Sequence, residues 1–276
     1  MATIGIFDSG IGGLSVFREI RRLLPTERYI YFADNAFCPY GTRSPSFIQE
    51  RAREITELLV RRGAEIIVVA CNTATAAAIA SLRAAFSEGP SEAVREWSDG
   101  RLDHICFIGM EPAVKPAALG TKSGVVGVLA TAGTLAASKY LKTRGLYEDE
   151  AHIAEHVGQG FVELVESGDL TGAHAEAVVR ESLTPLLEAG ADTIVLGCTH
   201  YPFLLETLRK VAREHTDTEI RFIDPAPAVA RQLLNVMDRE GIFHGPVGEA
   251  QLSGEADLTL LSSGPSCVLC DAARLL

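Results

Sequence analysis

Two apolar, β-branched runs that each lead to a cysteine constrain the fold of this chain most strongly. Residues 66–69 lead to Cys71, and residues 193–196 lead to Cys198. Such runs are typical of strands buried on both faces of a parallel sheet. A helix-compatible segment follows each cysteine, so each sulfur is predicted to lie at the carboxyl end of a strand and beside a helix amino terminus. Ligands bind at that edge of open α/β sheets, and the helix dipole stabilises a thiolate.

Strands and helices alternate along the rest of the chain, which predicts an α/β fold with mainly parallel sheets. The predicted strands are residues 4–7, 29–34, 66–69, 104–108, 124–130, 193–197, 219–223 and 258–261. The predicted helices are residues 14–24, 46–62, 75–86, 112–119, 134–144, 161–166, 173–189 and 202–215.

The 276 residues exceed one average domain. The separation in sequence between Asp8, where the first strand ends, and Cys71 is nearly equal to that between Thr131, where a later strand ends, and Cys198. This near-equality indicates an internal duplication. The polar stretch 87–100 contains glycine and proline and is predicted to cross between domains. We expect one domain from residues 1–97 plus 216–276 and a second from residues 98–215, with a cleft between them.

Composition and local patterns exclude several classes of protein. The net charge is −11 and no basic cluster stands out, which argues against nucleic acid as a partner. Residues 1–8 show no signal-peptide pattern and no apolar run is long enough to span a membrane, so we expect a cytoplasmic protein with no membrane partner. Its cysteines are then expected to be thiols, the Cys267/Cys270 pair included. His152–His156 matches a zinc pattern, but Gly158 and Gly160 argue against the helix it needs, so no metal is expected there.

The glycine-rich segment 8–13 is predicted to form an anion-binding turn between a strand and a helix. Ser15 replaces the third glycine of the dinucleotide pattern, so a small carboxylate suits this turn better than a nucleotide. A tight turn without a ligand is the alternative.

Paired thiols suit proton transfer at a carbon next to a carboxylate. One thiolate removes the proton, the thiol on the opposite face returns one, and donors stabilise the charge that develops. Asp8 and His200 are candidates to orient or tune the neighbouring sulfur. The candidate hydrogen-bond partners for substrate are Ser9, Asn72, Thr73 and Thr199.

Four segments resemble the signatures of the glutamate racemases, which are cofactor-independent members of the aspartate/glutamate racemase family. The segments are residues 7–16, 34–41, 70–74 and 197–202. The resemblance implies two pseudo-symmetric α/β domains, a site between them, and interconversion of L- and D-glutamate for peptidoglycan synthesis. It implies neither a cofactor nor a metal, and we expect a homodimer.

The resemblance also implies roles for individual residues. Cys71 and Cys198 are the implied proton donor and acceptor, supported by Asp8 and His200. The implied substrate-binding residues are Asp8, Ser9, Tyr40, Gly41, Asn72, Thr73, Thr199 and His200. Glu166 matches a glutamate that some members place near the site. The chain departs from the family at residues 158–161, where many members carry Cys-Pro, and stretch 87–100 is longer than usual.

Three alternatives stay open at this level. A racemase for aspartate, or another two-cysteine isomerase, differs only in its side-chain pocket. A solute-binding protein with an interdomain cleft needs neither thiol. A redox protein would join Cys71 and Cys198 in a disulfide, which needs a short distance between their Cα atoms.

Overall fold

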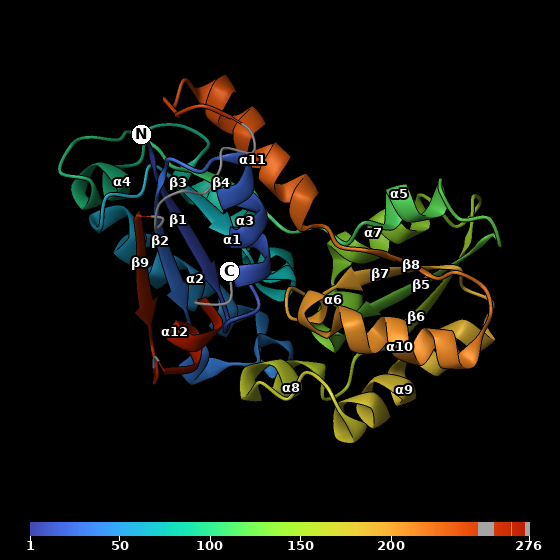
Figure 1. Cartoon of the computed structure of the whole chain (residues 1–276). Helices are drawn as coiled ribbons and strands as arrows, with labels where there is room; N and C mark the ends of the chain where they lie inside the picture. The colour runs from blue at the N-terminus through green and yellow to red at the C-terminus, as the bar shows by residue number, and fades with distance from the viewer. Residues whose placement is uncertain (248–256, 266, 274–276) are drawn as a thin grey trace. The chain divides into compact units, whose positions relative to one another are not determined.

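The chain forms two compact units, each built on one sheet of parallel strands (Figure 1). A computed structural model describes residues 1–247, 257–265 and 267–273, without the side chains of residues 267 and 268. Unit 1 contains Met1–Met110 and Ala226–Leu276, and unit 2 contains Glu111–Pro225. The two parallel sheets with their helices confirm the predicted α/β class.

The sheet of unit 1 has the strand order β4-β3-β1-β2-β9. Its strands are β1 (Thr3–Asp8), β2 (Arg28–Ala33), β3 (Ile66–Val69), β4 (Cys106–Gly109) and β9 (Asp257–Ser262). Phe7 of β1 lies opposite Val69 of β3 and opposite Phe32 of β2. The carboxyl ends of these strands therefore share one edge, where the predicted site residues follow β1 and β3.

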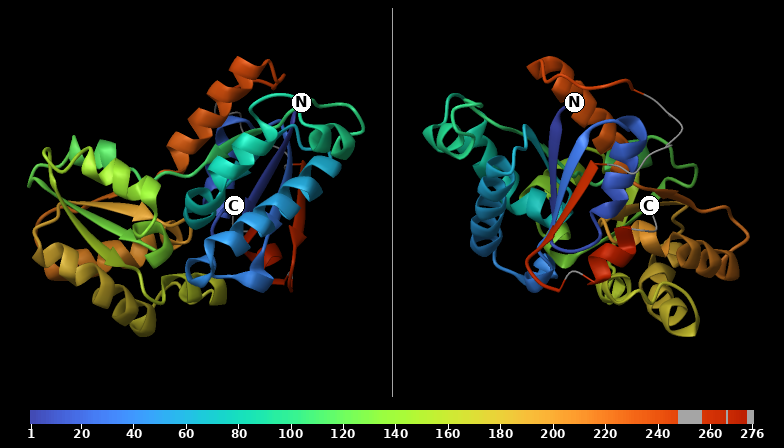
Figure 2. Two further views of the ribbon diagram at one scale, coloured as in Figure 1. Left: turned by 180° about the vertical axis from the view of Figure 1, so that it is seen from behind. Right: turned by 60° about the vertical axis from the view of Figure 1, so that its left-hand side comes forward.

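Helices cover both faces of this sheet. They are α1 (Leu14–Leu23), η1 (Asn35–Phe37), η2 (Tyr40–Thr42), α2 (Pro45–Arg61), α3 (Asn72–Phe86), α4 (Glu92–Trp97), α11 (Ala226–Glu240) and α12 (Cys267–Ala273). Helices α2 and α3 lie on one face, visible from behind in Figure 2, while α1 packs with α11 on the other. Phe7, Ile67 and Val69 pack against Leu59 of α2 and Ile79 of α3, so β1 and β3 are buried as their apolar sequences predict.

The sheet of unit 2 has the strand order β6-β5-β7-β8. Its strands are β5 (Val125–Ala130), β6 (His152–Val157), β7 (Thr193–Gly197) and β8 (Arg221–Ile223). Its helices are α5 (Val114–Ala118), α6 (Ala132–Leu135), α7 (Ser138–Gly145), α8 (Phe161–Ser167), α9 (Ala173–Glu188), η3 (Tyr201–Leu204) and α10 (Leu205–His215). Figure 1 shows α5 and α7 on one side of this sheet and α9 and α10 on the other. Within the described ranges, no helix is both long and apolar enough to cross a membrane.

The two sheets repeat one connectivity, as the internal duplication predicts. The order β4-β3-β1-β2 corresponds strand by strand to the order β8-β7-β5-β6. In this correspondence β3 matches β7, so Cys71 and Cys198 follow equivalent strands. Asp8 ends β1, and Thr131 follows the equivalent strand β5.

The boundaries between the two units differ from the expected domain boundaries at residues 97/98 and 215/216. Strand β4 lies beyond residue 98 but pairs with β3, which places it in unit 1. Strand β8 lies beyond residue 216 but pairs with β7, which places it in unit 2. Stretch 87–100, predicted as a crossing, forms α4 and packs Trp97 against Phe86 with 5.1 Å between ring centroids. Burial of this tryptophan holds the stretch in the core of unit 1.

Strand β6 was not predicted, and it contains the zinc-like residues His152–His156. A strand does not supply the helical turn that this pattern needs. Glu155 instead accepts hydrogen bonds from Tyr140 (2.6 Å) and Arg144 (3.1 Å). The strand was hard to predict because it lies at a sheet edge and carries polar residues on a half-buried surface.

Asp192 fixes the turn before β5 and provides a test of this fold. Its carboxylate accepts hydrogen bonds from Thr121 Oγ1 (2.6 Å) and from the backbone N–H groups of Lys122 (2.7 Å) and Ser123 (2.8 Å). Burial opposes ionisation of Asp192, but these hydrogen bonds outweigh it and lower its pKa to about 2. Because an unfolded aspartate titrates near 3.9, the ionised group stabilises the fold above about pH 4, and this contribution is lost as the pH falls toward 2.

We expect Asp192→Ala to lower the free energy of unfolding by about 1 kcal/mol at neutral pH, because the turn loses its acceptor. The difference from the native chain should shrink as the pH falls from about 4 toward 2. Urea unfolding followed by circular dichroism over this range measures both effects, with the exposed Asp217→Ala as the control. A difference that does not change with pH would contradict this role of the carboxylate.

Candidate functional site

Cys71 lies at the carboxyl edge of the sheet of unit 1 and caps helix α3. Its sulfur accepts a hydrogen bond from the backbone N–H of Ala74 at 3.5 Å, and its backbone is extended as an N-cap requires. The side chain is buried, and its sulfur lies 3.8 Å from Ser9 Oγ. The amino terminus of this 15-residue helix favours the thiolate form of Cys71.

Asp8 holds the loop that carries Ser9. Its buried carboxylate accepts hydrogen bonds from the N–H of Ser9 (2.7 Å), from Ser9 Oγ (3.3 Å) and from the N–H of Gly13 (2.6 Å). A Cβ atom at position 13 would lie 2.8 Å from the Tyr31 hydroxyl, so this position requires glycine. The predicted anion-binding turn thus binds the chain's own carboxylate with these two N–H groups, and the Ser9 hydroxyl contacts both Asp8 and the Cys71 sulfur.

Asn72 and Thr73 form the first turn of α3 and are almost fully buried. The Oδ1 and Nδ2 atoms of Asn72 find no hydrogen-bond partner among the residues that the structure describes. A buried amide without partners costs free energy, so native structures rarely retain one without a reason. This side chain therefore offers one donor and one acceptor to a polar ligand.

The Tyr40 hydroxyl is held by a buried ionic network. It donates to the carboxylate of Asp34, which also accepts two hydrogen bonds from Arg51, from Nε at 3.0 Å and from Nη2 at 2.8 Å. Burial, and then the hydrogen bond to Asp34, raise the pKa of Tyr40 well above its ordinary value. Tyr40 is thus a fixed neutral donor that positions the short helix η2 and its Gly41. Sequence reasoning assigned no role to Asp34 or Arg51.

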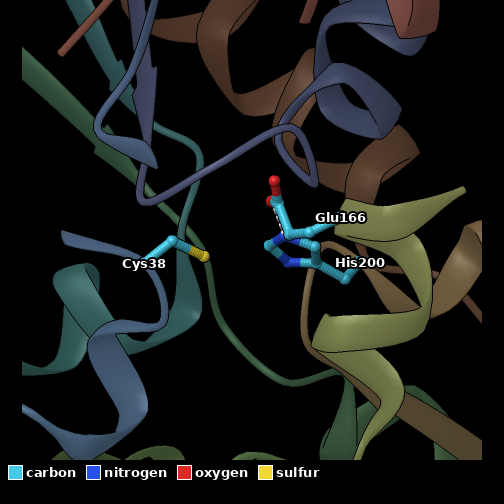
Figure 3. A group of neighbouring side chains, drawn as sticks. All are labelled: Cys38, Glu166 and His200. Carbon is cyan, nitrogen blue, oxygen red and sulfur yellow. Dashed lines mark hydrogen bonds and ion pairs between the residues drawn. The ribbon is translucent and has the colours of Figure 1, made fainter. Parts of the chain in front are cut away.

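Cys198 follows β7 and lies beside a histidine–glutamate pair. Its buried sulfur is 3.7 Å from His200 Nδ1. Figure 3 shows the other side of the ring, where His200 Nε2 lies 2.7 Å from Glu166 Oε1 of α8. A carboxylate only accepts hydrogen bonds, so Nε2 carries a proton, and in the neutral ring Nδ1 can accept the proton of the Cys198 thiol. This arrangement can form a thiolate–imidazolium pair whose positive charge Glu166 stabilises.

The segment after Cys198 differs from the expected helix amino terminus. A turn at Thr199 and His200 leads into the short 3-10 helix η3, so Cys198 caps no long helix. Tyr201 is fully buried and donates to the carbonyl of Gly158 at 3.3 Å. Burial, and then the charge of Cys198, raise the pKa of Tyr201. A side chain at position 158 would collide with the Tyr201 ring, which explains the glycine at the place where the chain departs from the pattern of the family it resembles.

The predicted site residues thus form two groups. The structure places Asp8, Ser9, Tyr40, Gly41, Cys71, Asn72 and Thr73 after the strands of unit 1. It places Cys198, Thr199 and His200 after β7 of unit 2, where His200 contacts both Cys198 and Glu166. The family resemblance was the signal for Glu166, and Asp34 and Tyr201 lie in two of the family-like segments, but no sequence pattern indicates Arg51.

A paired substitution on α3 tests whether Asn72 is retained for a ligand. Asn72→Ala should leave thermal stability unchanged or raise it, because it removes a buried amide without partners. Thr75 is the matched control, since its hydroxyl donates to Val69 O (3.2 Å) and accepts from Met110 N (2.9 Å). Thr75→Ala should lower the free energy of unfolding by roughly 1–3 kcal/mol, because it leaves buried backbone groups unpaired. Equal losses in the two variants, measured by urea unfolding, would contradict this reading of Asn72.

Known proteins match the chain over most of its length. The sequence profile of the Asp/Glu/Hydantoin racemase family matches residues 4–233. A glutamate racemase of Roseiflexus sp. (strain RS-1) is 46% identical over 240 residues, which cover 87% of this chain and 81% of that protein. A glutamate racemase of Pseudomonas putida is 42% identical over 257 residues, which cover 93% of this chain and 89% of that protein.

Solved structures agree with the sequence comparisons. Glutamate racemase isoform RacE1 from Bacillus anthracis superposes with a TM-score of 0.79 at 31% identity, covering 99% of this chain and 93% of that one. The Escherichia coli glutamate racemase in complex with L-glutamate and the activator UDP-MurNAc-ala gives a TM-score of 0.74 at 31% identity, covering 99% and 94%. The resemblance seen in the four sequence segments is confirmed. The chain belongs to the Asp/Glu/Hydantoin racemase family, among its glutamate racemases, and is an amino-acid isomerase.

Proposed function

We propose that this enzyme interconverts L- and D-glutamate without a cofactor, through two cysteine bases, and thereby supplies D-glutamate for peptidoglycan synthesis. The observation that carries the proposal is the pair of buried thiols, Cys71 and Cys198, at equivalent strand ends of a repeated sheet topology. Each thiol has its own neighbouring groups for proton transfer. Cytoplasmic location and a homodimer remain predictions that accompany this proposal.

In the proposed reaction each cysteine serves one face of the substrate's α-carbon. In one direction the Cys71 thiolate takes the α-proton and becomes a thiol, while the C–H electron pair stays on the substrate as an enolate-like carbanion. The Cys198 thiol, beside a His200 that is already protonated, then gives its proton to the opposite face and becomes a thiolate, which the unchanged imidazolium stabilises. The reverse reaction exchanges the two roles, so the enzyme needs no net proton and no oxidant.

The two thiols are supported by different chemistry. The amino terminus of α3 and the Ser9 hydroxyl stabilise the Cys71 thiolate through fixed dipoles. His200 can take up the proton of Cys198, and Glu166 then balances the charge on the ring. We infer that neither thiolate needs bulk water, so both can act as strong bases while almost fully buried.

Substrate binding in this proposal depends on short polar side chains beside the two thiols. Asn72 supplies a donor and an acceptor that are buried without partners in the described chain. Ser9, Thr73 and Thr199 add hydroxyl groups, and the loop at Gly41 adds backbone groups fixed by the Tyr40 network. Donors that face the substrate's carboxylate stabilise the enolate-like charge that forms on it.

Two other functions fit parts of the geometry. Racemisation of aspartate would use the same thiols, and the names of the compared relatives favour glutamate. A binding protein without turnover would need the polar groups but neither base. Following circular dichroism with L-glutamate and L-aspartate in parallel separates these cases, because only a turned-over substrate loses its signal.

We expect Cys71→Ala and Cys198→Ala each to lower racemase kcat at least about 10³-fold, because either variant lacks one of the two bases. Both variants should remain folded, since the change removes one sulfur atom from each site. Cys270→Ala, at a half-buried thiol outside the proposed site, is the matched control and should keep native activity. Near-normal turnover in either of the first two variants would overturn the two-base mechanism.

A further inference from the structure

Three side chains of unit 1 with no part in the proposed reaction gather where β4 begins. They are His104, Cys106 and Glu240. Ile105 points into the core beside Phe107, and both are almost fully buried. Because side chains alternate along an extended chain, His104 and Cys106 project together from the opposite face.

Helix α11 brings the third side chain to this face. It packs along β4 and ends at Glu240, whose Oε2 lies 3.6 Å from His104 Nε2. The imidazole nitrogen, the Cys106 sulfur and a carboxylate oxygen of Glu240 all lie within 4.8 Å of one another. The carboxyl end of a 15-residue helix carries negative partial charge, so it favours a cation at this place.

We propose that His104 Nε2, Cys106 Sγ and Glu240 Oε2 bind one Zn²⁺ ion, with water as the fourth ligand. Zinc takes thiolate, imidazole and carboxylate ligands in tetrahedral sites, whereas magnesium and calcium prefer oxygen alone. Metal–ligand bonds of about 2.0–2.3 Å place the ligand atoms of such a site about 3.2–3.8 Å apart. The ligand atoms, which now lie within 4.8 Å of one another, therefore need to approach by about 1.6 Å or less at their widest.

The surroundings allow this closure. The side chains of His104 and Glu240 are 42% and 27% exposed, so both can change rotamer. Arg239 contacts the other carboxylate oxygen, Oε1, at 2.9 Å and leaves Oε2 facing the imidazole. A bound ion would tie the edge strand β4 to the end of α11, two elements of unit 1 that are far apart in the sequence. It would thereby stabilise unit 1, because the unfolded chain holds the three ligands apart.

Cobalt is the probe for this site, because a cobalt–thiolate bond gives a charge-transfer band in the near ultraviolet and tetrahedral cobalt absorbs strongly in the visible. We expect the metal-free, full-length enzyme to develop both features and to saturate at one Co²⁺ per chain. Zn²⁺ should displace the colour and raise the melting temperature. Neither readout depends on racemase activity, so failure of the proposed reaction would leave this test intact.

Substitutions assign the ligands. Cys106→Ser keeps the size of the side chain and should abolish the charge-transfer band, while Cys270→Ser, at another half-buried thiol of unit 1, should retain it. His104→Ala and Glu240→Gln should each weaken Co²⁺ binding at least about 10-fold. A native enzyme that shows no band, a band that persists in Cys106→Ser, or unchanged affinity in both other variants would overturn the proposal.

Discussion

A thiolate that is almost fully buried must be stabilised by fixed groups of the protein, because little bulk water reaches it. Parallel strands meet this requirement at their carboxyl ends, where an apolar core gives way to loops and helix amino termini. Cys71 and Cys198 lie at this boundary in their own units. The buried, β-branched strands β3 and β7 are thus the scaffold that fixes each sulfur, and the polar residues after them are what make each sulfur a candidate base.

The repeated topology keeps the positions of the thiols while their chemistry differs. In unit 1, a helix amino terminus and a serine held by Asp8 surround Cys71. In unit 2, a turn and a 3-10 helix replace the capped helix, and the hydrogen-bonded His200–Glu166 pair lies beside Cys198 instead. In the proposed mechanism the substrate can have either hand, so each cysteine serves as acid in one direction and as base in the other. The different surroundings of Cys71 and Cys198 can therefore both support a thiol and a thiolate.

Strong local patterns made much of this structure predictable, and tertiary contacts determine the rest. Short β-branched runs such as 66–69 and 193–196 favour buried strands, so β3, β7 and the positions of the cysteines after them followed from sequence. Strand β6 and helix α4 have mixed sequences, and only packing on β5 or burial of Trp97 settles their state. Some contacts join residues that are far apart along the chain, and a single sequence does not show which of these residues meet. Examples are the Asp34–Arg51 network and the cluster of His104, Cys106 and Glu240.

The central claim is that two separate cysteines serve opposite faces of one α-carbon. The most direct measurement is deuterium incorporation at that carbon during early turnover in heavy water, starting from each enantiomer in turn. Thiol protons exchange with solvent, so the returning acid carries deuterium while the other base keeps the original proton. The account predicts label in the product and almost none in recovered substrate, from both directions. Equal labelling of substrate and product at low conversion would show a single base and contradict it.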